Sequence, residues 1–329
     1  MPANLPPQYF EIEKLYRSAK TPQEKIQYLQ AMLSVMPKHK GTDKLRAELR
    51  RKIAKLEEEA ERKSGGRRGG GLSIRKEGAG QVVLVGLPNA GKTRLVNALA
   101  GTDFPVADYP FTTQTPTPAM MKFENIQIQL IDMPPITGEN ARPWFSTLLR
   151  SADLMLIVLD LGEDPSDQMK VILSKLEEMR IKPLWRGGDG AAEDMLLFHL
   201  KKALLVGMKG DLEEAEIALE IFGEEFGKDA PLIRVSAETG EGIEELRRAI
   251  FEGLEIIRVY TKRPGEKPDF SEPVIAKKGS TVQEVAELIH KDFGEKLKFA
   301  EVWGSGKFGG QRVGRDYILQ DGDIVEFHI

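Results

Sequence analysis

A glycine-rich segment between a predicted strand and a predicted helix limits the fold of this chain more than any other feature. Residues 86–93 read Gly-Leu-Pro-Asn-Ala-Gly-Lys-Thr, which matches the P-loop pattern Gly-x-x-x-x-Gly-Lys-Thr. The apolar run 82–85 precedes this segment, and an amphipathic stretch over 92–100 follows it. In such a loop, backbone N–H groups and the positive end of the helix surround phosphate oxygens. The segment therefore predicts a nucleotide-phosphate site.

Two side chains of this loop carry chemistry. The ammonium group of Lys92 can reach the β- and γ-phosphates, and we predict it as a catalytic residue. The hydroxyl of Thr93 can coordinate Mg²⁺. Further nucleotide contacts are predicted for the rest of the loop and the first turn of the helix, namely Gly86, Pro88, Asn89, Ala90, Gly91 and Arg94.

Apolar strands and amphipathic helices alternate beyond the loop. This alternation predicts an α/β fold, with a mostly parallel sheet and helices on both faces. The strand 126–130 alternates apolar residues with Gln127 and Gln129, so we expect one of its sides to face water. The other expected strands are 82–85, 154–159, 203–206 and 233–235, and the expected helices are 92–100, 167–179 and 242–259.

Changes in composition divide the chain into four parts. Residues 1–63 carry apolar residues at helical spacing and predict an N-terminal helical region. Residues 64–78 begin with Ser-Gly-Gly-Arg-Arg-Gly-Gly-Gly, which predicts a flexible linker. A Pro- and Gly-containing stretch after residue 263 then separates the strand–helix domain, 79–263, from a small α+β module, 268–329.

The bulk composition excludes several classes of protein. The chain has no cysteine, so disulfides, thiolate zinc sites and cysteine nucleophiles are excluded. Because no apolar run has the length of a bilayer span and the first residues are unlike a secretory signal, we expect a cytoplasmic location and no membrane partner. Between Lys38 and Lys76, basic residues outnumber acidic ones about two to one. Such a stretch favours phosphate backbones, although a solvated helix and linker would carry similar charge.

Two segments further along the chain favour guanine over adenine. Met-Lys-Gly-Asp at 208–211 follows one predicted strand, and Ser-Ala-Glu at 236–238 follows the next. A carboxylate can accept hydrogen bonds from N1–H and the 2-amino group of guanine, a pair that adenine lacks. The stem of the lysine can cover the base, and the alanine N–H can reach guanine O6. The predicted base-reading residues are Lys209, Asp211, Ser236, Ala237 and Glu238.

With these motifs, the chain resembles the Obg-like P-loop GTPases and, within them, the developmentally regulated GTP-binding (DRG) branch. Residues 107–113, Ala-Asp-Tyr-Pro-Phe-Thr-Thr, are similar to the first switch of Obg-like proteins. Residues 257–262, 299–305 and 312–317 resemble segments of the DRG branch. The last two lie in a module similar to a TGS domain, a ubiquitin-like β-grasp fold. The resemblance implies a P-loop GTPase domain followed by a TGS-like domain, and the helical insertion usual in that branch is missing.

The resemblance also implies roles for individual residues. Thr113 would be the switch-I ligand of Mg²⁺ that senses the γ-phosphate, and it is the second predicted catalytic residue; Phe111 and Thr112 would lie beside the nucleotide. Asp132 would hold Mg²⁺ through a water molecule. Asn89 resembles the P-loop asparagine that binds K⁺ in potassium-stimulated members, and the alternative is an amide that stabilises the loop.

Three positions depart from the family pattern. Pro135 replaces the switch-II glycine whose N–H bonds the γ-phosphate, and proline has no N–H. Ile136 stands where some GTPases have a water-orienting glutamine. An apolar residue in place of that glutamine is usual in the Obg group. Met208 replaces an asparagine that braces the P-loop and contacts guanine N7. These departures put the rate of hydrolysis and the selectivity for guanine in question.

Three functions fit these residues. The first is a Mg²⁺-dependent GTPase switch that binds GTP and GDP. It would act with the ribosome or structured RNA and with a protein regulator. The second is a non-hydrolysing adaptor that binds GTP or GDP for stability while its outer domains bind RNA or protein. The third is a P-loop ATPase or kinase, for which Asp211 would be incidental.

Overall fold

The chain folds into two compact units, Met1–Ser73 and Ile74–Ile329. In this computed structural model the described residues are 74–104, 115–137, 143–185, 197–227, 231–306 and 308–329, with scattered residues between 9 and 53. Most of the predicted linker, 64–73, and switch I, 107–113, lie outside the described residues. Among the described residues, no helix combines the length and the hydropathy that a membrane crossing requires.

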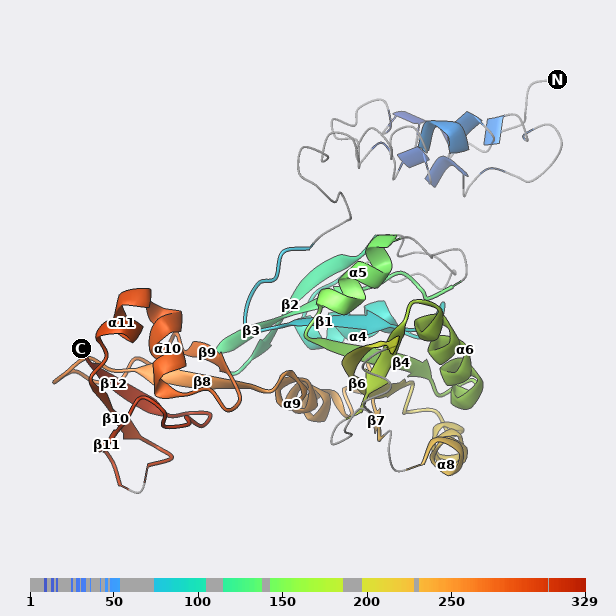
Figure 1. Ribbon diagram of the computed structural model, residues 1–329. Coiled ribbons are helices and arrows are strands. Elements are labelled where there is room, and N and C mark those ends of the chain that lie inside the picture. The colour runs from blue at the N-terminus through green and yellow to red at the C-terminus, as the bar shows by residue number, and fades with distance from the viewer. Residues whose placement is uncertain are drawn as a thin grey trace. The chain divides into compact units, whose positions relative to one another are not determined.

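A seven-stranded sheet forms the centre of the larger unit (Figure 1). The strand order is β2-β3-β1-β4-β6-β5, and β7 also pairs with β6. β2 runs antiparallel to β3, and every other pairing is parallel. The strands are β1 (Gln81–Val85), β2 (Thr117–Phe123), β3 (Ile126–Asp132), β4 (Leu154–Asp160), β5 (Ile181–Leu184), β6 (His199–Met208) and β7 (Leu232–Arg234).

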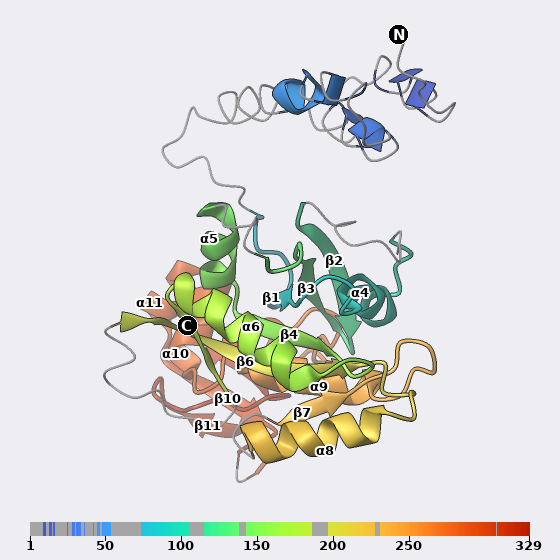
Figure 2. The same ribbon diagram turned by 90° about the vertical axis from the view of Figure 1, so that its right-hand side faces the viewer.

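Helices cover both faces of this sheet (Figures 1 and 2). Because side chains alternate along a strand, Val82 and Leu84 of β1 enter one core, and Val83 and Val85 enter the other. The first core includes α4 (Lys92–Ala100) and α9 (Ile243–Leu254), and the second includes α5 (Pro143–Ser151), α6 (Pro165–Glu178) and α8 (Ala215–Phe226). All five β1 residues are fully buried, as a central parallel strand requires. The predicted fold class is confirmed.

A second, five-stranded sheet of order β11-β10-β12-β8-β9 completes this unit. The helices α10 (Val282–Ile289) and α11 (Lys291–Lys296) accompany it, and Val285 and Ala286 of α10 lie in its core. A capping box begins α10, because the Thr281 hydroxyl accepts a hydrogen bond from the N–H of Glu284 and the Glu284 carboxylate accepts one from the N–H of Thr281. The strands are β8 (Ile256–Thr261), β9 (Val274–Lys277), β10 (Phe299–Trp303), β11 (Gln311–Val313) and β12 (Ile324–His328).

The predicted helix over 242–259 is wrong after Leu254. The helix ends at Leu254, Glu255 adopts a left-handed φ of 52°, and the chain continues as β8. β8 pairs with β9 and β12, so it belongs to the second sheet. The predicted boundary at 263–268 is therefore too late, and the second domain begins near residue 256. The apolar run of β8 suits a helix or a strand equally, and pairing with β12 decided between them.

The prediction that one side of β3 faces water is only partly correct. Gln127 is exposed, but Gln129 is 2% exposed. The side-chain amide of Gln81 donates to Oε1 of Gln129 at 2.7 Å, and Gln129 donates to the carbonyl of Arg75 at 3.2 Å. Residues 74–80 thus lie against the sheet, and they satisfy a buried amide that the alternation pattern assigns to water.

The smaller unit has its own apolar cluster. Its described residues bury Tyr9, Leu29, Met32, Met36, Leu49 and Ile53 together, and all of these except Met36 are helical. Leu45, Leu49 and Ile53 share the helical stripe that the spacing predicts, and all three join this cluster. This stripe therefore packs against apolar residues from the earlier part of the same unit, such as Leu29 and Met32.

Candidate nucleotide-binding site

The P-loop connects β1 to α4 at the carboxyl edge of the sheet. Asn89 has a left-handed φ of 61°, and Gly91, which caps α4, has a φ of 84°. Glycine is required at Gly86 for a different reason, since a Cβ there would lie 2.6 Å from the carbonyl oxygen of Val158. The loop leads directly into the N-terminus of α4, where backbone N–H groups and the helix dipole favour an anion. Pro88 is half-buried, Ala90 is buried and Arg94 is exposed on α4.

Lys92 lies folded into this loop. Its ammonium donates to the carbonyl oxygens of Gly86 at 3.1 Å and Leu87 at 2.9 Å, and the residue is 6% exposed. Burial lowers the pKa of Lys92 to about 8, and the charge of Asp132 works in the opposite direction. A cation held in this way needs an anionic partner, which the phosphates of a nucleotide would supply.

Thr93 and Asp132 lie side by side. The hydroxyl of Thr93, in the first turn of α4, donates to Oδ2 of Asp132, at the end of β3, at 2.6 Å. Asp132 is 2% exposed, so its carboxylate is held close to the P-loop. Hydroxyl and carboxylate oxygens are the donors that Mg²⁺ prefers, and the pair therefore fits the predicted magnesium site.

The segment after Asp132 lies against the P-loop. The N–H of Ile136 donates to the carbonyl oxygen of Gly86 at 3.0 Å, and residues 133–136 are buried. Ile136 and Met133 belong to the core beneath the loop. The amide next to Pro135 is thus engaged by the P-loop, where the family pattern has a glycine amide directed at the γ-phosphate.

Met208 also contacts the P-loop. A methyl group on Gly91 would lie 3.3 Å from Cε of Met208, and Met208 is 2% exposed. Met208 and Ala90 belong to one apolar cluster. Contact between apolar atoms therefore supports the loop at the position where the family pattern has an asparagine, and the thioether offers no hydrogen-bond donor to guanine N7.

The two base-reading segments are tied to each other. The pKa of Asp211 is lowered, and hydrogen bonding to the Ser236 side chain is the main cause. The buried Ser236 hydroxyl also accepts from the N–H groups of Glu238 at 3.2 Å and Thr239 at 3.1 Å. The N–H of Gly210 donates to the carbonyl of Val235 at 3.0 Å. Asp211 remains exposed and ionised, as acceptance of guanine N–H groups requires.

Lys209 has a partner that the sequence reading missed. The Lys209 ammonium lies 2.6 Å from Oδ2 of Asp160, a residue that is 4% exposed. The backbone of Lys209 has a left-handed φ of 60°. Asp160 is not among the site residues that the sequence predicts. Asp160 ends β4 opposite Met208 of β6, so adjacent parallel strands bring it beside Lys209. A carboxylate at the carboxyl end of a central strand was the available signal.

The predicted site residues therefore divide into two groups. The loop and base-reading residues lie at the carboxyl edge of the first sheet, on the connections that follow β1, β3, β6 and β7. This is where open α/β sheets bind ligands. The predicted switch-I residues Phe111, Thr112 and Thr113 lie outside the described residues. Ala237 is half-buried and Glu238 exposed, next to Ser236.

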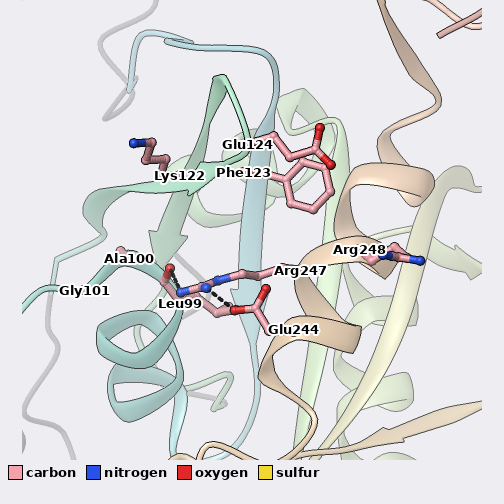
Figure 3. A pocket seen from close by; sticks show the side chains of 9 residues that line it. All are labelled: Leu99, Ala100, Gly101, Lys122, Phe123, Glu124, Glu244, Arg247 and Arg248. Carbon is pink, nitrogen blue, oxygen red and sulfur yellow. Dashed lines mark hydrogen bonds and ion pairs between the residues drawn. The ribbon is translucent and has the colours of Figure 1, made fainter. Parts of the chain in front are cut away.

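A separate cavity of about 430 Å³ lies at the other end of α4 (Figure 3). Arg247 of α9 crosses it, donates to the carbonyls of Ala98 at 3.2 Å and Leu99 at 2.9 Å, and pairs with Glu244. Arg247 thus neutralises the negative end of the helix whose positive end faces the P-loop. The cavity is lined by Leu99, Ala100, Gly101, Lys122, Phe123, Glu124, Glu244, Arg247 and Arg248.

Two family models match the chain. Residues 81–186 match the model described as 50S ribosome-binding GTPase. Residues 257–329 match the TGS domain, and this match begins within β8, which the structure assigns to the second sheet.

Similarity to three relatives extends over nearly all of the chain. An uncharacterized GTP-binding protein of Methanocaldococcus jannaschii is 32% identical, with 92% of each chain covered. Developmentally-regulated GTP-binding protein 1 of Xenopus laevis is 28% identical, and ribosome-interacting GTPase 1 of Saccharomyces cerevisiae is 26% identical. Each of these two comparisons covers 92% of this chain and 97% of the relative. With its P-loop, its base-reading connections and its second sheet, this chain belongs to the DRG branch of the Obg-like P-loop GTPases, with a C-terminal TGS domain.

Proposed function

We propose that this protein is a guanine-nucleotide switch that hydrolyses GTP slowly with Mg²⁺ and acts with the ribosome or structured RNA. The observation that carries the proposal is the convergence of two bonded pairs at one sheet edge. Thr93 bonds Asp132 for the metal, and Gly210, next to Asp211, bonds Val235, next to Ser236, for the base. Membership of a GTP-binding family supports the choice of nucleotide.

Residues of this chain would hold the metal and the phosphates. The Thr93 hydroxyl would bind Mg²⁺ directly, and Asp132 would bind it through water. The hydroxyl oxygen of Thr93 and Oδ2 of Asp132 lie 2.6 Å apart. The Mg²⁺ held by these residues would supply positive charge that offsets the negative charge developing during phosphoryl transfer. Lys92 would exchange the carbonyls of Gly86 and Leu87 for phosphate oxygens. Thr113 remains a predicted second ligand in switch I.

Switch II argues for slow hydrolysis. Pro135 offers no N–H to a γ-phosphate, and the side chain of Ile136 cannot orient a water molecule. Loss of one charge-assisted hydrogen bond weakens recognition by roughly 1.5–3 kcal/mol. A rate that rises on assembly with a partner would suit this geometry, because partners supply missing catalytic groups to many GTPases.

The second sheet is placed to respond to the nucleotide. The β2–β3 hairpin, which joins the segment after switch I to Asp132, contacts β8 through its turn residues. Asn125 of this turn donates to the hydroxyl of Tyr260 at 2.7 Å and to the carbonyl of Phe270 at 3.0 Å. A shift of the hairpin on GTP binding would therefore reach the TGS domain through these bonds.

Names of relatives and charge favour the ribosome or RNA as the partner. The family model carries the description 50S ribosome-binding GTPase, and the yeast relative is called a ribosome-interacting GTPase. In this chain the basic stretch Lys38–Lys76 supplies positive charge suited to phosphate backbones. This partner implies a cytoplasmic location. Binding would weaken steeply as salt rises, because counterions are released when phosphates are neutralised.

The test is a titration of nucleotide-free protein with fluorescent GDP, GTP and ATP in Mg²⁺ buffer. We expect preference for guanine nucleotides and its loss in Asp211→Asn, with the exposed Glu213→Gln as a control in the same loop. Equal affinity for ATP would overturn the base-reading assignment. Multiple-turnover hydrolysis, with and without ribosomes, separates the switch from the non-hydrolysing adaptor.

The same assay tests the potassium prediction. Asn89 is exposed at the tip of the P-loop, where a K⁺ ion would lie beside the phosphates. If Asn89 binds K⁺, hydrolysis is faster in K⁺ than in Na⁺, and Asn89→Ala removes the difference. Equal rates in the two salts leave Asn89 with its role in the loop backbone, where its φ is 61°.

A further inference from the structure

Helix α8 exposes an apolar pair in an acidic surface. Ile217 is 61% exposed and Ile221 is 51% exposed, and their spacing of four places them next to each other on the helix. Between 212 and 226 there is no lysine or arginine. Six exposed glutamates surround the pair in the sequence: Glu213, Glu214, Glu216, Glu220, Glu224 and Glu225.

The exposed pair is not needed for packing of α8. Ala215 and Phe222 are the buried residues of this helix, and Phe222 stacks on Phe226 with ring centroids 4.8 Å apart. In Figures 1 and 2, α8 lies at the outer margin of the first domain, with α6 as its neighbouring helix. One cation reaches α8 from that helix, since Lys170 pairs with Glu225 at 2.7 Å. The isoleucine pair and the other five glutamates are thus directed to solvent.

Charge selects the kind of partner that can cover this face. Nucleic acid is excluded, because glutamates repel phosphates. Anionic membrane is excluded for the same reason, and amphipathic helices that lie on membranes have basic polar faces. A protein segment with apolar residues along one side and lysine or arginine around them complements both features. We propose that the α8 face, defined by Ile217, Ile221 and the surrounding glutamates, docks a basic amphipathic segment of a partner protein.

The position of α8 links this surface to the nucleotide. The N–H of Ala215, the first residue of α8, donates to the carbonyl of Leu212 at 3.1 Å, and Leu212 donates to Lys209 at 3.1 Å. Asp211 thus lies within the turn that leads into the helix. A partner on α8 would restrain this turn and slow the release of guanine nucleotide. The proposal names the chemistry of the protein regulator of the proposed switch and in that respect rests on it.

The direct test uses the full chain and three fluorescent probes. The first is an 18-residue peptide with leucines on one helical face and lysines elsewhere. The second has the same composition with the leucines dispersed, and the third is a structured RNA hairpin. Ile217→Ser/Ile221→Ser removes the apolar pair at exposed positions, and Val171→Ser changes an exposed apolar residue of α6 as the matched control.

We expect the first peptide to bind more tightly than the second. The affinity of the first peptide for the double variant is lower than for the wild type by at least about tenfold, or 1.4 kcal/mol. Its affinity for Val171→Ser stays within about twofold of the wild-type value. The affinity of the RNA hairpin is unchanged by the double variant. Equal binding of the two peptides, or no effect of the double variant on the first, would overturn the proposal. Weaker RNA binding in the double variant would show that α8 contacts RNA and would overturn it as well.

A charge variant separates this inference from the proposed function. The charge variant is Glu216→Gln/Glu220→Gln/Glu224→Gln. If charge complementarity operates, this variant binds the first peptide with lower affinity than the wild type, and the control Glu177→Gln on α6 does not. Both readouts use peptide alone, so they decide the α8 proposal even when guanine preference fails. If the protein prefers guanine nucleotides but the α8 variants do not change peptide binding, the proposed switch stands and the docking surface on α8 is overturned.

Discussion

Met208, at the end of β6, packs against Gly91 of the P-loop, with 3.3 Å between Cε and the position that a Cβ on Gly91 would take. This contact joins the base-reading strand to the phosphate loop through apolar atoms. It explains how the loop is supported without the asparagine of the family pattern.

Shortening Met208 should weaken both stability and nucleotide binding. Met208→Ala leaves a cavity beside Gly91, and we expect a loss of about 2–5 kcal/mol in the free energy of unfolding. Met208→Leu keeps the volume and should cost less than about 1.5 kcal/mol. Urea unfolding and GDP titration of both variants measure the effect. Similar stability of Met208→Ala and wild type would contradict the supporting role of Met208.

Nucleotide affinity should fall as pH rises above 8. The free protein holds Lys92 with a pKa of about 8, and bound phosphates raise this pKa because they stabilise the charged form. Below pH 8 the group is protonated in both states, so it adds no pH dependence. Above pH 8 binding must take up a proton, and affinity declines by up to about tenfold per pH unit.

GDP titration between pH 7.5 and 9 measures this decline. Lys92→Arg is the control, because arginine stays charged throughout this range. Its affinity should not decline in parallel with that of the wild type. Parallel pH profiles would assign the effect to the nucleotide or to another group.

The Arg258 guanidinium should contribute to the joint between the two sheets. It donates to both oxygens of Asp321, at 3.0 Å and 2.7 Å, pairs with Glu124 of the β2–β3 turn, and lies 4.9 Å from the ring centroid of Phe251. Because Arg258 is 9% exposed, Arg258→Met should lower the free energy of unfolding by about 1.5–3 kcal/mol. Glu124→Gln should cost less than about 1 kcal/mol, since Glu124 is exposed.

Denaturant unfolding of Arg258→Met, Glu124→Gln and the double variant tests this joint. A coupling energy above about 0.5 kcal/mol would show that the pair acts across the two sheets. Additive single effects would assign the contribution of Arg258 to Asp321 within the TGS domain.

The buried Lys201 should make stability rise with pH. Its ammonium donates to the carbonyls of Arg150 at 2.8 Å and Ala152, beyond the end of α5, and burial lowers its pKa to about 8. The unfolded chain has a pKa of 10.5 at this group, so it binds more protons than the folded chain between pH 8 and 10.5. The free energy of unfolding therefore increases across this window.

Lys201→Met removes this titration. The free energy of unfolding of the wild type minus that of the variant should increase from pH 7.5 to 9.5. Guanidinium unfolding at matched ionic strength measures the difference. A constant difference would mean that Lys201 has an ordinary pKa in the folded chain.

Local sequence was enough to predict much of this protein. The spacing of Gly86, Gly91, Lys92 and Thr93 predicts a P-loop because each residue acts on backbone or phosphate within one turn of chain. Alternating strands and helices likewise predicted the α/β class, since each element follows its own apolar period. The base-reading turns could be recognised because they come directly after strands.

Tertiary structure decided the contacts between segments. Asp160 reaches Lys209 because β4 and β6 are neighbours, and Gln81 reaches Gln129 because β1 and β3 are. Strand order is a property of the whole sheet, so no local pattern contains it. The run 256–261 became β8 through pairing with β12, which is distant in sequence. The sequence by itself determined which residues are predicted to bind phosphate and base, because these motifs are local. Packing of the sheets decided which residues support them, because strand order belongs to the whole fold.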